Sequence, residues 1–188
     1  IYQIYKRKHM RLHTLLACSL LGLATSAFAA NDNKSIYHKD WIDFNKNNTK
    51  DVYEDPTAPI DDRVEDLLRQ MTPKEKIGQL LTKFGWPLYE RKGEKITLTP
   101  EAEKVLVELG TGGLWGFMRA DPWTQKTLKN GLNPQYAITA TNLLQRYCIE
   151  NTRLGIPVLL AEECPHGHMA IGTTSFPTGI GQASTWNP

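Results

Sequence analysis

The stretch that decides the fold runs Ile156-Pro157-Val158-Leu159-Leu160-Ala161-Glu162-Glu163-Cys164-Pro165-His166-Gly167-His168. Its first six residues are apolar and follow a glycine, which predicts a short buried strand. Its last seven residues form a dense polar group. Because ligands meet the carboxyl ends of strands in α/β proteins, this polar group is the first place to look for a binding site.

A second buried strand is predicted at residues 112–118, which are apolar and Gly-rich. Asn133-Pro134 opens a helix between the two strands that runs to about Arg153. A strand, a helix and a strand in this order form a βαβ unit, so the fold class is α/β with a parallel sheet. Two parallel strands cannot form an independent domain, and Asn187-Pro188 resembles the start of another helix, so we expect a truncated chain.

Three helices are predicted before the first strand. Apolar residues between 64 and 71 fall on one helical stripe. Thr72 and Glu75 form a capping box that opens a second helix, whose apolar face should continue through residues 77–84. The third helix should span residues 99–110 and end at a glycine suited to a left-handed C-terminal cap.

The first 29 residues have the layout of a secretory signal peptide. A basic stretch at residues 6–11 precedes an apolar run at 15–23, and small residues flank a predicted cleavage site after Ala29. The apolar run is too short to span a bilayer stably. We therefore expect a bacterial protein exported to the periplasm or secreted, with no stable membrane span.

The N-terminal residues also suggest where the protein starts and where its ordered domain begins. Met10 is a candidate for the true start, which would place residues 1–9 upstream of the protein. Cys18 lies in a loose lipoprotein-like box, but the apolar run continues past it, so we expect no lipid anchor there. Residues 30–60 are polar and form either an extended segment that wraps the domain or a disordered terminus. Residues 61–188 hold the ordered domain.

Charge and composition exclude several functions. The chain has 188 residues, of which 40% are hydrophobic and 22% charged, as in ordinary globular proteins. Four of its 22 basic residues and none of its 20 acidic residues precede position 30, so the rest carries 18 basic against 20 acidic. Such a balance provides no broad basic face, so we expect no nucleic-acid partner.

The polar group after the second strand allows two interpretations. Glu162 and Glu163 are adjacent, and only one can point toward the centre of a site because side chains alternate along a strand. Buried carboxylates are costly unless something uses them. Either they bind a ligand, or they and the neighbouring histidines form a structural network. The group also contains residue types that bind metals, but no second cluster accompanies it, so we expect no metal site.

A loop follows the first strand and reads Arg119-Ala120-Asp121-Pro122-Trp123. The face of Trp123 could stack on the C–H surface of a sugar while Arg119 donates to its hydroxyls. Alternatively, Trp123 packs in the core and Arg119 pairs with Asp121. The spacing alone leaves both possibilities open.

Four segments in the same order resemble glycoside hydrolase family 3. They are residues 63–80, 150–157, 163–167 and 176–188. The resemblance covers about residues 51–188. It implies the N-terminal portion of a (β/α)8 TIM-type barrel, incomplete in this chain. It also implies a β-glucosidase-like O-glycosyl hydrolase that removes terminal non-reducing β-D-glycosyl residues with retention and without a cofactor.

The resemblance assigns no catalytic residue to this chain. Retention needs two carboxyl groups about 5–5.5 Å apart, one a nucleophile and the other an acid/base. In the family, the nucleophile is an Asp late in the barrel and the acid/base usually comes from beyond the barrel. Neither motif is present here, so the missing C-terminal remainder would supply both, and this fragment alone is expected to be inactive.

One sugar-binding residue is carried over from the family. Glu163 lies three residues before the His-Gly pair, where the family holds hydroxyls of the terminal sugar; Arg119 and His166 are further candidates. β-Glucosidase-type members usually have Asp there, and the longer Glu would crowd the hydroxymethyl group of glucose, which favours xylose. The other segments resemble β-glucosidases, so we expect glucose first and xylose second. A secreted, non-catalytic carbohydrate-binding fragment is the remaining alternative.

Overall fold

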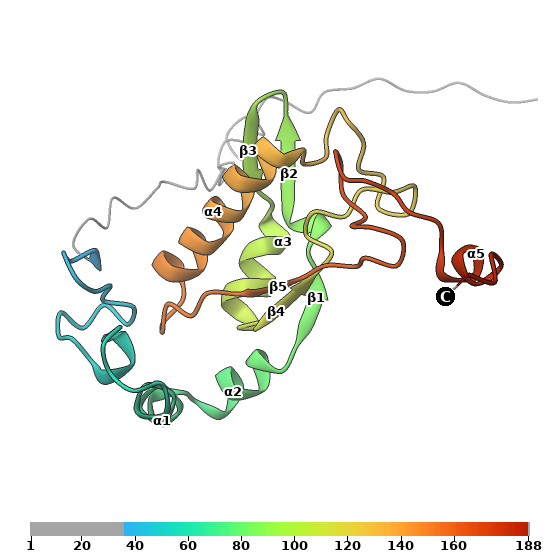
Figure 1. The fold of residues 1–188 in the computed structure, drawn as a ribbon. Coiled ribbons are helices and arrows are strands. Elements are labelled where there is room, and N and C mark those ends of the chain that lie inside the picture. Colours follow the sequence, from blue (N-terminus) through green and yellow to red (C-terminus); the bar gives the residue numbers. More distant parts are fainter. Residues whose placement is uncertain (1–35, 188) are drawn as a thin grey trace, which may run out of the picture. The chain divides into compact units, whose positions relative to one another are not determined.

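The computed structural model describes residues 36–187. The predicted signal peptide at residues 1–29, its cleavage site after Ala29 and the lipoprotein-like Cys18 lie outside the described residues. Short strands and helices make up the described part (Figure 1). Within it, no helix combines the length and the apolar character needed to cross a membrane.

Three short parallel strands form the central sheet. In spatial order they are β1 (Thr82–Phe84), β4 (Gly113–Trp115) and β5 (Leu159–Ala161). Helix α4 (Pro134–Asn151) lies between β4 and β5 in the chain, and these two strands pair in parallel. The predicted βαβ unit is therefore confirmed.

The register of this sheet sorts side chains onto two faces. Leu114 pairs with Lys83 on one side and Leu160 on the other. Leu114 is fully buried in the core, so this register position faces the helices. The next position places three side chains on the opposite face: Phe84, Trp115 and Ala161.

A second, separate sheet was not predicted. Strands β2 (Tyr89–Lys92) and β3 (Lys95–Leu98) form an antiparallel hairpin. Gly93 lies in the tight turn between them with φ +63°, a conformation that glycine adopts without steric cost. The hairpin supplies Tyr89 to the hydrophobic core.

The prediction of a (β/α)8 TIM-type barrel is wrong. The parallel strands form an open sheet of three among residues 36–187, and the hairpin belongs to a different sheet. A barrel requires a closed ring of tilted, staggered strands, and three strands of three residues cannot form one. The barrel was implied by the family resemblance rather than by strand signals in the residues. The described fold is mixed α/β.

The remaining helical segments are short. In chain order they are η2 (Val52–Glu54), α1 (Ile60–Gln70), α2 (Pro73–Gln79), η3 (Trp86–Leu88), α3 (Pro100–Glu103), the π-helical turn η4 (Lys104–Glu108) and α5 (Gly179–Ala183). Helix α2 begins at the predicted capping box, in which Thr72 Oγ1 accepts from Glu75 N at 3.3 Å and Glu75 Oε2 accepts from Thr72 N at 2.8 Å. The predicted glycine after the third helix, Gly110, has φ +62°.

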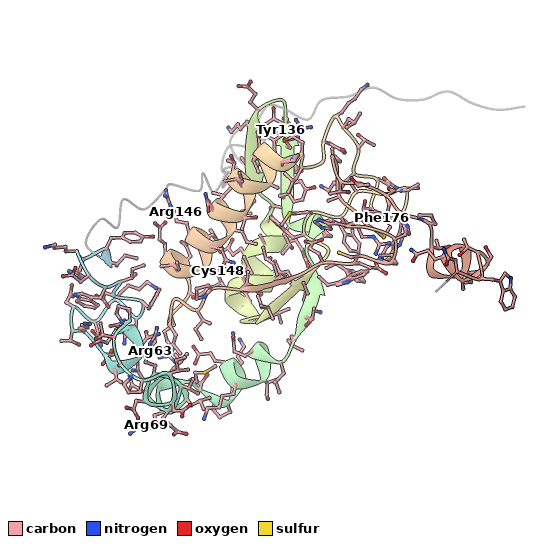
Figure 2. The ribbon with its side chains drawn as sticks, in the orientation of Figure 1. Arg63, Arg69, Tyr136, Arg146, Cys148 and Phe176 are labelled. Atoms are coloured by element: carbon pink, nitrogen blue, oxygen red, sulfur yellow. The ribbon has the colours of Figure 1, made fainter. Side chains whose placement is uncertain are left out.

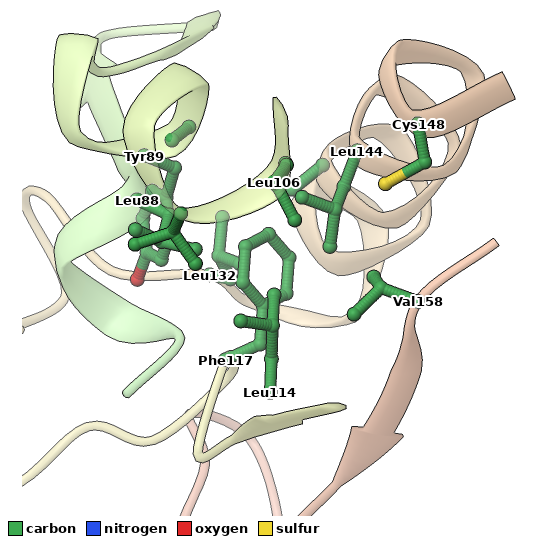
Figure 3. Close-up of a cluster of buried hydrophobic side chains, with 12 residues drawn as sticks. Leu88, Tyr89, Leu106, Leu114, Phe117, Leu132, Leu144, Cys148 and Val158 are labelled. Carbon is green, nitrogen blue, oxygen red and sulfur yellow. The ribbon is translucent and has the colours of Figure 1, made fainter. Parts of the chain in front are cut away.

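One hydrophobic cluster joins the central sheet to α3, η4 and α4 (Figure 3). Leu106 of η4 lies next to Leu144 of α4, above Leu114 and Phe117. Leu114, Phe117 and Leu144 are all fully buried. Burying each such side chain contributes about 1.5–3 kcal/mol, so this layer fixes α4 on the sheet. Figure 2 places Cys148 farther along α4, and its thiol is also buried.

The segment before α1 is tied to the C-terminal end of α4. Lys46 Nζ donates to the carbonyl oxygens of Phe44, Ile149 and Thr152 at 2.7, 2.8 and 2.5 Å. Two of these carbonyls belong to the last turn of α4 and its C-cap, where a cation interacts favourably with the helix dipole. Asp43 is buried nearby and accepts from the backbone N–H groups of Asn47 and Asn48.

Candidate functional site

The candidate site lies at the carboxyl ends of β4 and β5. Glu162 and Glu163 follow β5 directly, and Met118 and Arg119 follow β4 after a short turn. Because neighbouring parallel strands end at the same edge, the two pairs of residues meet there. Each glutamate contacts a different one of the residues from the β4 side.

Glu162 contacts protein groups from both strand ends. Its Oε1 accepts from the backbone N–H of Met118 at 3.0 Å, and its Oε2 lies 3.3 Å from His168 Nε2. The Glu162 side chain is 15% exposed. These contacts join the ends of β4 and β5, as the structural-network interpretation of the polar group anticipated for a carboxylate and a histidine.

Glu163 points to a different partner. Its Oε2 accepts a hydrogen bond from Arg119 Nη1, and the side chain of Glu163 is 38% exposed against 12% for Arg119. Arg119 also donates from Nε to Asp121 Oδ2 at 2.7 Å, and its Nη2 forms an ion pair with the same oxygen at 2.7 Å. Arg119 is thus clamped between two carboxylates, and of the three side chains Glu163 is the most open to solvent.

Asp121 in turn stabilises the loop after β4. Its Oδ1 accepts from Thr124 N at 2.8 Å, and its own N–H donates to Thr124 Oγ1 at 3.0 Å. Burial acts to raise the pKa of Asp121, but the hydrogen bonds from Thr124 and Arg119 outweigh it and hold the pKa below its ordinary value. The carboxylate that orients Arg119 is therefore charged at neutral pH.

The buried Arg91 holds the far end of the same loop. Its guanidinium donates to the carbonyl oxygens of Gly131, Gly93 and Leu128 at 2.7, 2.6 and 2.7 Å. It also lies 4.4 Å from the ring centroid of Tyr136, in the first turn of α4 (Figure 2). The loop between β4 and α4 is thus fixed at both ends, so the residues on it keep a defined position.

Sequence reasoning missed an aromatic cluster beside this charge network. Its four rings come from the end of β1, from η3, from the end of β4 and from the loop after β4: Phe84, Trp86, Trp115 and Trp123. All six pairs of ring centroids lie between 4.5 and 6.2 Å apart. The aromatic Phe84-Gly85-Trp86 stretch is a possible signal, but the apolar spacing predicts a helix as far as Phe84.

The rings differ in exposure. Trp123 is 58% exposed and Phe84 is 50% exposed, whereas Trp86 and Trp115 are half-buried. Trp123 is therefore not packed in the core of residues 36–187, although the Arg119–Asp121 pair of that same alternative is present. The Arg119 guanidinium carbon lies 4.9 Å from the centroids of both Trp115 and Trp123, within the range of a cation–π interaction.

His166 and Cys164 lie in the turn after Glu163. The carbonyl of His166 accepts from Phe176 N at 2.6 Å, which ties this turn to the later loop that carries Phe176. Cys164 is exposed. In the part of the chain that the structure describes, no group of three or more His, Cys, Asp or Glu side chains is placed to hold a metal ion.

An apolar cavity of 320 Å³ lies at the opposite end of β5. Residues of α1 and residues 154–157, which precede β5, line it together with Phe44 and Tyr53. None of the predicted site residues belongs to this lining. Parallel strands present ligand sites at their carboxyl ends, so we locate the candidate site at Glu163 rather than at this cavity.

Comparison with known proteins gives one informative similarity. A protein of Formosa agariphila named "Putative beta-xylosidase" is 29% identical to this chain over 136 residues, which is 72% of the chain. The aligned part makes up 16% of that protein. No protein-family model matches the sequence.

Proposed function

We propose that the protein containing this chain is a glycoside hydrolase that removes terminal β-linked sugar residues with retention of configuration. The observation that carries the proposal is Glu163, a half-exposed carboxylate at the carboxyl end of a parallel strand, held by an arginine beside aromatic rings. The resemblance of four segments to glycoside hydrolase family 3 supports the same activity, as does the similarity to the Formosa agariphila protein.

In this proposal Glu163 binds hydroxyl groups of the terminal sugar. Arg119 contacts only Oε2 of Glu163, and an ionised carboxylate has about four acceptor positions, so sugar hydroxyls can donate to the others. Arg119 and Asp121 orient the carboxylate, and His166 on the adjoining turn is a second candidate contact. Hydrogen bonds to hydroxyls that strengthen in the transition state accelerate glycoside hydrolysis.

The catalytic carboxyl groups belong to the rest of the protein in this proposal. Neither family motif for them occurs in residues 1–188. The chain aligns to 16% of the length of its relative, so the activity is proposed for the whole protein and not for the chain alone. Export to the periplasm or outside the cell, expected from residues 1–29, fits an enzyme that acts on oligosaccharides.

We reverse the order expected from the sequence and propose xylose ahead of glucose as the terminal sugar. A Glu at position 163 reaches one methylene farther than an Asp and would crowd the hydroxymethyl group that glucose carries and xylose lacks. The printed name of the relative supports the same order. Glucose is the second candidate, because the other segments resemble β-glucosidases.

Rates on aryl β-xylosides and β-glucosides test the proposal in the complete protein. Glu163→Gln keeps the side-chain size but removes the charge, and we expect kcat/KM to fall about 100-fold, or about 2.7 kcal/mol of transition-state stabilisation. Glu163→Asp should retain part of the activity and move the preference toward glucosides. Glu94→Gln, an exposed carboxylate in the β2–β3 turn, is the matched control and should leave the rates unchanged.

The outcome separates three interpretations. Wild-type kcat/KM in Glu163→Gln on both substrates would remove Glu163 from the sugar site. Sugar binding without any hydrolysis by the complete protein would favour the carbohydrate-binding alternative, which the exposed Trp123 also supports.

A further inference from the structure

The aromatic cluster is built into the sheet rather than placed on a mobile surface. Phe84 and Trp115 are paired in the register of β1 and β4, on the face opposite the core. Trp123 meets Phe84 edge to face at 5.5 Å and an interplanar angle of 83°. Trp123 follows Asp121, whose two hydrogen bonds to Thr124 fix the chain on both sides of the ring.

Two rings of the cluster remain open to solvent although their neighbours are packed. Trp123 is held by the neighbouring rings yet is 58% exposed, so part of its indole ring is free to contact a ligand. Phe84 is similarly open at 50%. Exposed apolar surface rimmed by polar groups is characteristic of ligand sites.

The polar rim identifies the class of ligand. Arg119 already occupies the cation position over Trp115 and Trp123, so a positively charged ligand would meet a like charge. Its charge is balanced by Asp121 and Glu163, so the rim has no excess positive charge for a phosphate. A neutral sugar ring fits both the aromatic rings and the charged rim. Its C–H face matches the electron-rich face of an indole, and its hydroxyls match the carboxylates and the guanidinium.

We propose that Trp123, with Phe84 beside it, is a stacking platform for a second sugar ring of the oligosaccharide whose terminal ring Glu163 holds. The Arg119 guanidinium links the two positions, since it contacts both the Trp123 ring and the Glu163 carboxylate. The platform rests on the proposed function and adds that the substrate is an oligosaccharide rather than an isolated glycoside. It makes Trp123 a determinant of chain-length preference.

The test compares substrates with one and with three sugar rings in the complete protein. We expect Trp123→Ala to lower kcat/KM on β-linked xylotriose about tenfold, because stacking on the second ring is lost. The same variant should stay within about twofold of wild type on methyl β-xyloside, which has no second ring. Trp123→Phe keeps an aromatic face and should recover most of the loss. Trp41→Ala, another tryptophan with a stacked partner, His38, at 4.1 Å, is the control and should change neither rate.

Each outcome decides the platform and the proposed function separately. Equal losses on both substrates in Trp123→Ala, or no loss on xylotriose, would overturn the platform while hydrolysis stands. If the complete protein cleaves neither substrate, xylotriose binding is measured by calorimetry for the wild type and for Trp123→Phe and Trp123→Ala. Binding that only Trp123→Ala weakens supports the platform without the hydrolase, whereas absence of binding in the wild type overturns the platform as well.

Discussion

Replacing Arg153 by alanine should destabilise the folded protein at neutral pH and have much less effect in acid. Arg153 donates from Nε to Glu75 Oε1 at 2.8 Å and from Nη2 to Glu75 Oε2 at 2.6 Å. Its Nη2 also donates to the carbonyl of Gln70 at 2.8 Å. This bidentate ion pair joins the first turn of α2 to the segment that leads from α4 to β5.

The size of the effect follows from the pKa of Glu75. Hydrogen bonds from Arg153 lower that pKa from 4.5 to about 2, opposed by burial and assisted by hydrogen bonds from Thr72. A pKa lowered from 4.5 to about 2 corresponds to about 3.4 kcal/mol at most. Because the side chain of Arg153 is 53% exposed and that of Glu75 is 25% exposed, solvent screens much of this energy. We expect a loss of about 1–2 kcal/mol for Arg153→Ala at pH 7.

The pH dependence has a definite sign. The folded pKa of Glu75 lies below its unfolded value, so the bridge stabilises fully above about pH 4.5 and loses its effect as the pH falls toward 2. Urea denaturation should therefore show less than half of the pH 7 loss at about pH 3. A loss of the same size at both pH values would refute the reasoning.

Two further variants make this experiment specific. Glu75→Gln keeps the oxygen that accepts from Thr72 N, so it removes the charge and leaves the capping box in place. It should reproduce the pH 7 loss, and the double variant with Arg153→Ala should lose less than the sum of the two. Lys92→Ala is the control, because its pair with Glu90 is 85% and 56% exposed and should contribute less than about 0.5 kcal/mol.

Two remaining predictions concern packing and thiol reactivity. Leu144→Ala should lower the free energy of unfolding by about 3–4 kcal/mol, because the Leu144 side chain is fully buried. Ile138→Ala is the control on the same helix; Ile138 is 65% exposed, so its loss should be less than about 0.5 kcal/mol. Equal losses for the two variants in urea denaturation would contradict this. Burial raises the pKa of the Cys148 thiol to about 11, whereas the Cys164 side chain is exposed. Iodoacetamide at about pH 8 should therefore alkylate Cys164 and leave Cys148 unmodified in the folded protein. Mass spectrometry of the alkylated protein measures both. Rapid alkylation of native Cys148 would show that this face of α4 is not packed against the core.

Local signals in the sequence predicted the middle of the fold well. The capping box at Thr72 and Glu75, the glycine after the third helix and the helix that begins at Pro134 are all present. Each depends on residues within one or two turns of the chain, so the sequence carries the information locally. The parallel pairing of β4 with β5 followed from the helix between them.

The predicted apolar helix face over residues 77–84 is wrong. The spacing suits a helix, but α2 ends at Gln79 and residues 82–84 form β1. Ile77 and Leu80 are 62% and 85% exposed, so the apolar stripe packs against little of the described structure. What makes β1 a strand is its pairing with β4, some 31 positions later in the chain, and a periodicity analysis contains no such long-range information.

The candidate site was predictable only in part. Glu163 and Arg119 were both candidates because each follows a predicted strand, and the structure brings them into one ion pair. The strand pattern alone does not separate Glu162 from Glu163; the family resemblance selects Glu163, and the contacts of Glu162 with Met118 and His168 give it a different role. The aromatic cluster was missed because its rings come from separate segments that meet only through the sheet.

The core and the candidate site are coupled through strand register. Leu114 and Trp115 are consecutive, so burying Leu114 against α4 forces Trp115 to the opposite face, beside Phe84 of β1. A slip of β4 by one residue would expose Leu114, which is now fully buried, at a cost of about 1.5–3 kcal/mol, and would point Trp115 into the core. The same alternation on β5 keeps Leu160 against the core. The packing energy of the apolar cluster therefore holds the aromatic rings in place, so variants that loosen the core should weaken the proposed sugar binding even where they touch no site residue.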